Sequence, residues 1–272
     1  MTEAAPGRVD LHSHLVPGVD DGARTLEDSR TGLRRLLQAG VGALATTPHL
    51  AGSVTLDEDR FEAVMEVMDA GWTALADLGA REFPGLTLAR GHEVALDDPD
   101  TRFDDARVRL GGTSFALVEW PRFNPPPASE AAVQRIRRQG VRPLIAHVER
   151  YQGALRDLGR VARWKEAGAF VQVSYGSLFG RYGPEARSVA QRLLERGWVD
   201  VLATDLHPLP GAEVYIEDAE EMLQRAGAEE AFHTLSALNP GRILEDQEPL
   251  APPPLILAPG FWQRFKGLIR RR

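Results

Sequence analysis

Short apolar runs alternate along this chain with longer amphipathic runs. The short runs have the length and composition of buried strands, and the longer ones space their apolar residues three or four positions apart, as a helix does. Seven such units follow one another between residues 8 and 203. This alternation is typical of an α/β fold with a parallel sheet or barrel.

The pattern predicts seven strands, most of which have a polar residue at or directly after their end. They are Arg8–His12, Val41–Thr47, Leu86–Ala89, Phe115–Trp120, Val141–Ala146, Ala169–Ser174 and Val199–Ala203. Seven parallel strands with short connections favour a closed or nearly closed barrel, whose active sites lie at the carboxyl ends of the strands.

The amphipathic runs predict the helices between these strands. The first begins with a capping box from Thr25 to Asp28 and ends near Gly40. We expect its apolar side to consist of Leu26, Leu33, Leu36 and Leu37. The other expected helices are Asp57–Leu78, Ser129–Gln139, Leu155–Ala167 and Pro184–Arg196, and the chain from Ala212 onward is expected to be mostly helical.

The length of 272 residues suits one α/β barrel. We expect a single barrel domain over residues 1–248, followed by a Pro-rich and then basic tail over residues 249–272.

Composition narrows the class of function. The net charge of −7 does not favour a nucleic-acid partner. We expect no transmembrane segment, because no apolar run reaches the ~20 residues that span a bilayer. The amino-terminal residues are too few and too polar for a secretory signal, so a cytoplasmic location is expected. With no cysteine in the chain, a cysteine nucleophile is excluded.

Histidine and acidic residues gather at the expected strand ends. Neutral imidazole and ionised carboxylate are ligands for Zn, Mn or Fe. In a strand, residues two apart point to the same side, so His12 and His14 could approach one ion. The full candidate set is His12, His14, Asp21, His49, Glu93, Glu119, His147, Asp205 and His207.

These candidates differ in strength. Glu119 interrupts an otherwise apolar strand, where a carboxylate is costly unless it is paired or bound to metal. Asp21 could instead belong to a simple turn, and His49 to an exposed loop. Two other histidines are assigned structural roles: His92, expected to point away from Glu93, and His233, in a predicted helix.

Arg150 follows His147 by three residues. An arginine beside a site with several metals can bind a phosphate with two parallel hydrogen bonds. The alternative is a solvated loop arginine.

The order of motifs resembles the polymerase and histidinol phosphatase (PHP) family, and more narrowly the PHP-type bacterial protein-tyrosine phosphatases of capsule and exopolysaccharide clusters. The resemblance covers about residues 8–245. Its motifs begin with Val9-Asp10-Leu11-His12-Ser13-His14 and Asp20-Asp21-Gly22, and continue through Thr47-Pro48-His49, Gly91-His92-Glu93, Leu117-Val118-Glu119-Trp120-Pro121, Ala146-His147-Val148-Glu149-Arg150-Tyr151, Gln172-Val173-Ser174-Tyr175-Gly176 and Thr204-Asp205-Leu206-His207.

The resemblance implies a distorted (β/α)7 TIM-like barrel that holds three divalent metal ions, with Mn as the first expectation and Fe, Zn or Co as alternatives. The first ion would take His12, His14, Glu93 and Asp205. The second would share Glu93 and add Glu119 and His147. The third would take Asp21, His49 and His207, and Arg150 would bind the phosphate.

The implied reaction is hydrolysis of phosphotyrosine in proteins. A metal-bound hydroxide would attack phosphorus, and His207 or Asp205 would protonate the leaving oxygen. The implied partner is a phosphotyrosyl protein, with a bacterial tyrosine autokinase as the candidate; the oligomeric state stays open. One departure is that residues 208–213 contain no arginine, where many relatives carry one that also contacts phosphate.

Three alternatives remain. One is a phosphomonoesterase of the histidinol-phosphate type, or an exonuclease-like phosphoesterase, from the same superfamily. Another is a non-catalytic regulatory homologue, which the intact ligand set argues against. The third is an amidohydrolase, disfavoured because neither lysine, Lys165 or Lys266, lies at a strand end.

Overall fold

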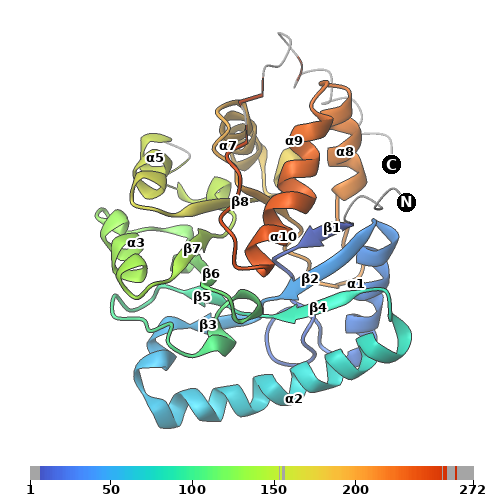
Figure 1. Cartoon of the computed structure of the whole chain (residues 1–272), viewed down its shortest axis with the longest axis vertical. Coiled ribbons are helices and arrows are strands. Elements are labelled where there is room, and N and C mark those ends of the chain that lie inside the picture. Colours follow the sequence, from blue (N-terminus) through green and yellow to red (C-terminus); the bar gives the residue numbers. More distant parts are fainter. Residues whose placement is uncertain (1–6, 153, 155–156, 253, 256–260, 262–272) are drawn as a thin grey trace.

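The computed structural model describes residues 7–152, 154, 157–252, 254–255 and 261 (Figure 1). Every strand pairing in this part of the chain is parallel. One sheet has the order β1-β2-β4 and the other the order β3-β5-β6-β7-β8-β9. The strands are β1 (Arg8–Asp10), β2 (Val41–Thr46), β3 (His49–Ala51), β4 (Thr87–Arg90), β5 (Glu93–Ala95), β6 (Phe115–Glu119), β7 (Arg142–Ile145), β8 (Phe170–Ser174) and β9 (Val201–Ala203).

The two sheets are parts of one barrel. Two strand positions are kinked: Thr47-Pro48 separates β2 from β3, and Gly91-His92 separates β4 from β5. Proline interrupts a ladder because it has no N–H to donate. The barrel closes through a parallel bridge between Ser13 and Leu206, next to the carboxyl ends of β1 and β9. The seven strand positions confirm the expected distorted (β/α)7 barrel, with the kinks as its distortion.

The helices surround these strands. In Figure 1 the long α2 runs beside β4, and α10 lies close to β1. The helices are α1 (Leu26–Gln38), α2 (Glu58–Glu82), α3 (Ser129–Arg138), α5 (Gly159–Glu166), α6 (Tyr175–Leu178), α7 (Pro184–Glu195), α8 (Ile216–Gln224), α9 (Glu229–His233), a π-helical turn η6 (Thr234–Leu238) and α10 (Asn239–Leu244). Short 3-10 turns are η1 (Gly52–Leu56), η2 (Ala106–Val108), η3 (Leu110–Gly112), η4 (Pro121–Phe123) and η5 (Val148–Arg150).

Alternate strand residues fill the barrel interior. Phe115 and Leu117 of β6, and Val201 and Ala203 of β9, belong to one buried apolar cluster, while the residues between them pack outward. Because side chains alternate along a strand, the next inward position after Leu117 is Glu119, and Asp205 follows Ala203 in the same spacing. The apolar side chains therefore fill the barrel interior, and polar side chains lie at the carboxyl ends of the strands.

The helix predictions are mostly confirmed. The capping box of α1 forms as expected, with the Thr25 hydroxyl accepting from the Asp28 N–H and the Asp28 carboxylate accepting from the Thr25 N–H. The prediction that Leu37 packs inward is wrong: its side chain is 43% exposed, because it lies about 100° around the helix from the buried Leu36.

Two helices begin later than expected. The helix predicted from Leu155 begins at Gly159 as α5, and residues 155–156 lie outside the described part of the chain. The helical region predicted from Ala212 begins only at Ile216. Most of the tail over residues 249–272 is likewise outside the described residues, so the division into domain and tail stays a prediction. None of the described helices combines the length and apolar character needed to cross a membrane.

The capping box generates a stability prediction. Thr25→Ala removes the cap of α1 and should lower the free energy of unfolding by about 1 kcal/mol. Urea unfolding of metal-free protein measures this. The control is Thr73→Ala, which replaces an exposed threonine inside α2 by a better helix former and should cause no loss. Equal stabilities of Thr25→Ala and the unsubstituted protein would contradict the assigned cap.

Candidate metal centre

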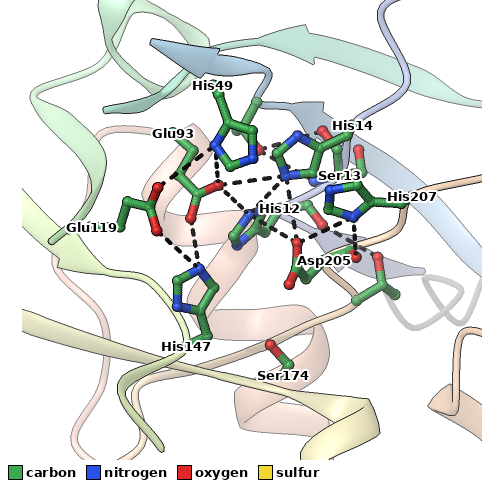
Figure 2. Close-up of polar contacts among 12 residues, drawn as sticks. His12, Ser13, His14, His49, Glu93, Glu119, His147, Ser174, Asp205 and His207 are labelled. Carbon is green, nitrogen blue, oxygen red and sulfur yellow. Dashed lines mark hydrogen bonds and ion pairs between the residues drawn. The ribbon is translucent and has the colours of Figure 1, made fainter. Parts of the chain in front are cut away.

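All nine predicted ligand residues meet at the carboxyl ends of the strands, and Figure 2 shows eight of them by label, with their rings and carboxylates pointing toward one another. They form overlapping groups in which the nitrogen and oxygen atoms lie within 4.8 Å of one another. The groups are His12, His14 and Asp205; His12, Glu93 and His147; His49, Glu93 and Glu119; and His14, Asp21, His49 and His207.

Glu93 lies at the centre of the cluster and is only 1% exposed. Its Oε2 is 3.2 Å from His12 Nε2, 3.5 Å from His14 Nε2 and 3.0 Å from His49 Nδ1, while its Oε1 is 2.7 Å from His147 Nε2. Burial opposes its charge, but the charges of His12 and His147 hold the pKa of Glu93 well below its usual range. The centre of the site is therefore a buried anion.

His12 and His14 face the same point, as their spacing predicted. Their Nε2 atoms lie 3.2 Å apart, and each is within 3.4 Å of Asp205 Oδ1. Although burial disfavours a charged ring, Glu93 and Asp205 raise the pKa of His12 to about 9. These carboxylates therefore demand positive charge, which a proton on His12 supplies when no cation is bound.

Two residues that the sequence did not single out orient these rings. Gln172 Oε1 accepts a hydrogen bond from the backbone N–H of His147 at 2.9 Å and lies 3.1 Å from His12 Nδ1. Asp20 Oδ2 lies 2.7 Å from His14 Nδ1. Because these contacts hold Nδ1 of His12 and His14, Nε2 of each ring points into the cluster. Metal-ligating histidines are commonly oriented in this way, by a partner on the ring nitrogen that does not face the metal.

The turn after His14 depends on Gly22. The Gly22 N–H donates to Asp20 Oδ1 at 3.0 Å, so one carboxylate supports both the turn and the His14 ring. A Cβ at Gly22 would lie 2.2 Å from the His14 carbonyl oxygen and 2.3 Å from the His14 Cβ. The Asp20-Asp21-Gly22 segment is thus a turn, as the alternative reading proposed, and it also brings Asp21 to the cluster.

Asp21, His49 and His207 make up the outer edge of the cluster. Asp21 Oδ1 is 3.4 Å from His49 Nε2 and 3.2 Å from His207 Nε2, and the His207 ring stacks on His14 at 4.1 Å between centroids. The Asp21 side chain is 70% exposed and that of His49 40% exposed, whereas His12 and His14 are completely buried. The cluster therefore opens to solvent on this side.

The Glu119 carboxylate lies near the rings of His147 and His49 but beyond hydrogen-bond distance of both. Glu119 Oε2 lies 3.8 Å from His147 Nε2, and Glu119 Oε1 lies 3.7 Å from His49 Nδ1. Burial and the neighbouring charge of Glu93 raise the pKa of Glu119 to about 7. These separations exceed a normal hydrogen bond and leave the atoms free to turn toward a shared cation.

The donor set fits divalent ions. Two ligands, each about 2.1 Å from a shared ion, lie about 3.0–3.4 Å apart in octahedral or tetrahedral geometry. Most of the nitrogen–oxygen separations around Glu93 and Asp205 are in or near this range. Glu93 Oε2 is buried and has no hydrogen-bond partner among the described residues. A buried oxygen without a partner is unfavourable, and a bound cation would satisfy it.

Arg150 contacts the cluster from the rim. Its guanidinium donates to Asp205 Oδ2 at 2.8 Å, and its side chain is 19% exposed, so the alternative of a freely solvated loop arginine is wrong. Burial opposes the charge of Asp205, but His12, His14 and His147 hold its pKa far below the usual range. Asp205 is thus an anion shared between the cluster and Arg150.

The two histidines assigned structural roles lie outside the cluster. His92 is 1% exposed, its Nδ1 is 3.0 Å from the Arg107 carbonyl oxygen, and burial lowers its pKa to about 4. It points away from Glu93, as expected. His233, at the end of α9, lines a surface cavity of about 370 Å³ with Arg8 and Glu220.

Comparison with known proteins decides the family. Residues 8–245 match the family described as capsular polysaccharide synthesis, CpsB/CapC. The chain belongs to the CpsB/CapC family. This confirms the resemblance to PHP-type phosphatases of capsule clusters that the motifs indicated.

Named members of the CpsB/CapC family match over most of the chain. Tyrosine-protein phosphatase CpsB of Streptococcus pneumoniae is 26% identical, over 88% of this chain and 99% of its own length. Tyrosine-protein phosphatase YwqE of Bacillus subtilis is 27% identical, over 90% of this chain and 95% of its own.

The fold is also similar to a solved structure. A chain from the crystal structures of YwqE and CpsB, described as unique metal-dependent tyrosine phosphatases, superposes with a TM-score of 0.76. The match has 24% sequence identity and covers 92% of this chain and 99% of the other. The likeness confirms the barrel fold.

The close approach at Gly22 generates a second prediction. Gly22→Ala should lower the free energy of unfolding by about 2–3 kcal/mol, because the added Cβ displaces His14. Gly85→Ala is the control, since a Cβ at Gly85 meets nothing within 4 Å. Urea unfolding of both metal-free variants measures the effect. A Gly22→Ala protein as stable as Gly85→Ala would contradict the described turn.

The charge of His12 generates a third prediction. Below about pH 9 the His12 ring holds a proton that a bound ion must displace, so metal binding at pH 7 should release about one proton or more. Apparent affinity should therefore fall as pH falls from 9 to 6, by about tenfold per unit for each displaced proton. Calorimetric titration of metal-free protein in buffers of different ionisation enthalpy measures the release. Binding with no proton release would contradict the described charge state.

Proposed function

We propose that this chain is a metal-dependent protein phosphatase that hydrolyses phosphotyrosine and acts in capsule or exopolysaccharide synthesis. The observation that carries the proposal is the convergence of nine imidazole and carboxylate ligands on one rim that also presents Arg150. The named phosphatases in the same family give the substrate class. A phosphotyrosyl protein is the proposed partner, with a bacterial tyrosine autokinase as the candidate.

The proposed metal content is three divalent ions, with Mn first and Fe, Zn or Co as alternatives. The proposed ligands are those of the sequence analysis, now with two of them shared: His14 lies between the inner and outer groups, and His49 between Glu93 and Asp21. When bound, such ions lower the pKa of water and neutralise charge on phosphoryl oxygens.

The protein's own groups bind and orient the phosphate. Arg150 can donate two parallel hydrogen bonds to phosphoryl oxygens, and its contact with Asp205 aims it at the rim. Asp205 is kept ionised by its cationic neighbours, and burial together with His14 lowers the pKa of His207, so neither of the two proposed proton donors for the leaving oxygen holds a proton firmly at neutral pH. A tyrosyl phenolate, with a pKa of ~10, needs little help from an acid.

The depth of the site supports an aryl substrate. The innermost ligands, His12 and Glu93, are nearly or completely buried, whereas the side chains of Asp21 and His49 at the outer edge are 70% and 40% exposed. A phosphate carried on the long, flat stem of tyrosine reaches further into such an opening than one on serine. The absence of cysteine excludes the thiolate route to the same reaction.

Reconstitution tests this proposal. Metal-stripped protein is assayed on p-nitrophenyl phosphate, a phosphotyrosine peptide, histidinol phosphate and a phosphodiester, with Mn, Fe, Zn, Co or Mg added back singly. We expect restored hydrolysis of the two aryl phosphates, with the peptide preferred over histidinol phosphate and the diester. Preference for histidinol phosphate would favour the small-molecule alternative, and metal binding without any hydrolysis would favour a regulatory homologue.

A ligand variant tests the site itself. His147→Ala should lower kcat by more than about 100-fold, because even partners behind the ligands typically contribute 10–100-fold. His233→Ala is the matched control outside the cluster and should keep near-normal turnover. Near-normal turnover in a folded His147→Ala protein would contradict the proposed site.

A further inference from the structure

Arg150 lies between two aromatic rings. The Cζ of its guanidinium is 4.3 Å from the centroid of Phe123 and 4.2 Å from the centroid of Tyr182. An arginine this close to a ring face is attracted by the ring's quadrupole, and the attraction grows when water is excluded. Both rings therefore stabilise the guanidinium in its position between them.

The order of the barrel strands explains this arrangement. Phe123 follows β6, Arg150 follows β7 and Tyr182 lies between β8 and α7, and these three strands are neighbours in the sheet. Their carboxyl-end loops therefore lie side by side, with the arginine in the middle.

The backbone near Phe123 is held in an unfavourable conformation. Arg122 and Phe123 both have positive φ, 56° and 52°, which is uncommon for residues other than glycine. Such strain persists only where the surroundings impose it, and it is frequent at functional sites. Phe123 also packs edge-on against the His147 ring, with 5.3 Å between centroids. The strained turn thus places the Phe123 ring against His147 and Arg150.

Tyr182 is also tied to the site through its hydroxyl. The hydroxyl donates to Asp205 Oδ2 at 3.5 Å, the same oxygen that accepts from Arg150 at 2.8 Å. Among the described residues, Asp205 is the one hydrogen-bond acceptor that the Arg150 guanidinium has. Stacking and this single bond thus hold the guanidinium, leaving most of its N–H groups for another acceptor.

We propose that Phe123 and Tyr182 are positioning residues, which hold Arg150 so that its unpaired N–H groups face the phosphoryl group of the substrate. The inference rests on the proposed phosphatase function. The rings contact no reacting atom in this arrangement, and they act through the arginine. A planar guanidinium can stack in this way, while the ammonium of lysine cannot.

The first test is a double-mutant cycle on hydrolysis of a phosphotyrosine peptide by the metal-loaded protein. Tyr182→Leu and Phe123→Leu should each lower kcat/KM about 3- to 30-fold and raise the inhibition constant of inorganic phosphate by a similar factor. Tyr182→Phe should keep most of the activity, because the ring remains. Trp72→Leu is the control, since it removes a ring from over Arg90, away from the site.

The cycle is completed with Arg150→Ala. If the rings act through the arginine, Tyr182→Leu should change kcat/KM less than twofold in the Arg150→Ala background. The full loss persisting in that background would overturn the proposal, because the ring would then act on something else.

The second test does not depend on catalysis. Rotation of the Arg150 guanidinium is followed by nitrogen NMR, its signal assigned by its loss in Arg150→Lys. Rotation should be slow in the unsubstituted protein and faster in Tyr182→Leu and Phe123→Leu. Unchanged rotation in both would overturn the positioning role. Faster rotation in a protein that hydrolyses no phosphoester would refute the proposed function and retain the positioning role.

Discussion

Negative charge concentrated at one end of a closed barrel is the constraint on which this structure depends. Glu93 is buried among four imidazoles, and Asp205 lies beside two of them and Arg150. Carboxylates in such a place are unfavourable without compensating positive charge. The raised pKa of His12 shows that this demand is strong enough to retain a proton well above neutral pH. A divalent cation would meet the same demand with the same side chains.

The barrel is what makes this concentration possible. Apolar residues from alternate strand positions fill its interior and force the next inward positions, such as Glu119 and Asp205, to the open end. The kink at Pro48 divides one strand position into β2 and β3, and the kink at Gly91-His92 divides the next into β4 and β5. His49 and Glu93 begin these short strands and pair in register, which brings one ligand from each to the centre of the cluster.

Much of this could be predicted from the sequence, because strand ends are visible as the points where apolar runs stop. The placement of His147 and Asp205 at the barrel's open end follows from that rule and from the parallel fold. Gln172 was missed because it lies inside a strand, and its role depends on the distant residues His12 and His147. The sequence places Asp20 in a turn, which is correct, but its contact with His14 is visible only in three dimensions. The burial of Leu37 was misjudged because helical spacing alone does not fix where an apolar face ends.

The most direct test of the central claim is the location of bound cations. Anomalous X-ray scattering from crystals soaked in Mn would show the position of each bound Mn ion. We expect ions among the nine side chains, with Glu93 Oε2 contacting at least one and the outermost ion lying between Asp21 and His207. Crystals soaked at saturating Mn that show the ion only at other surfaces, with the cluster still held by protons and ion pairs, would contradict it.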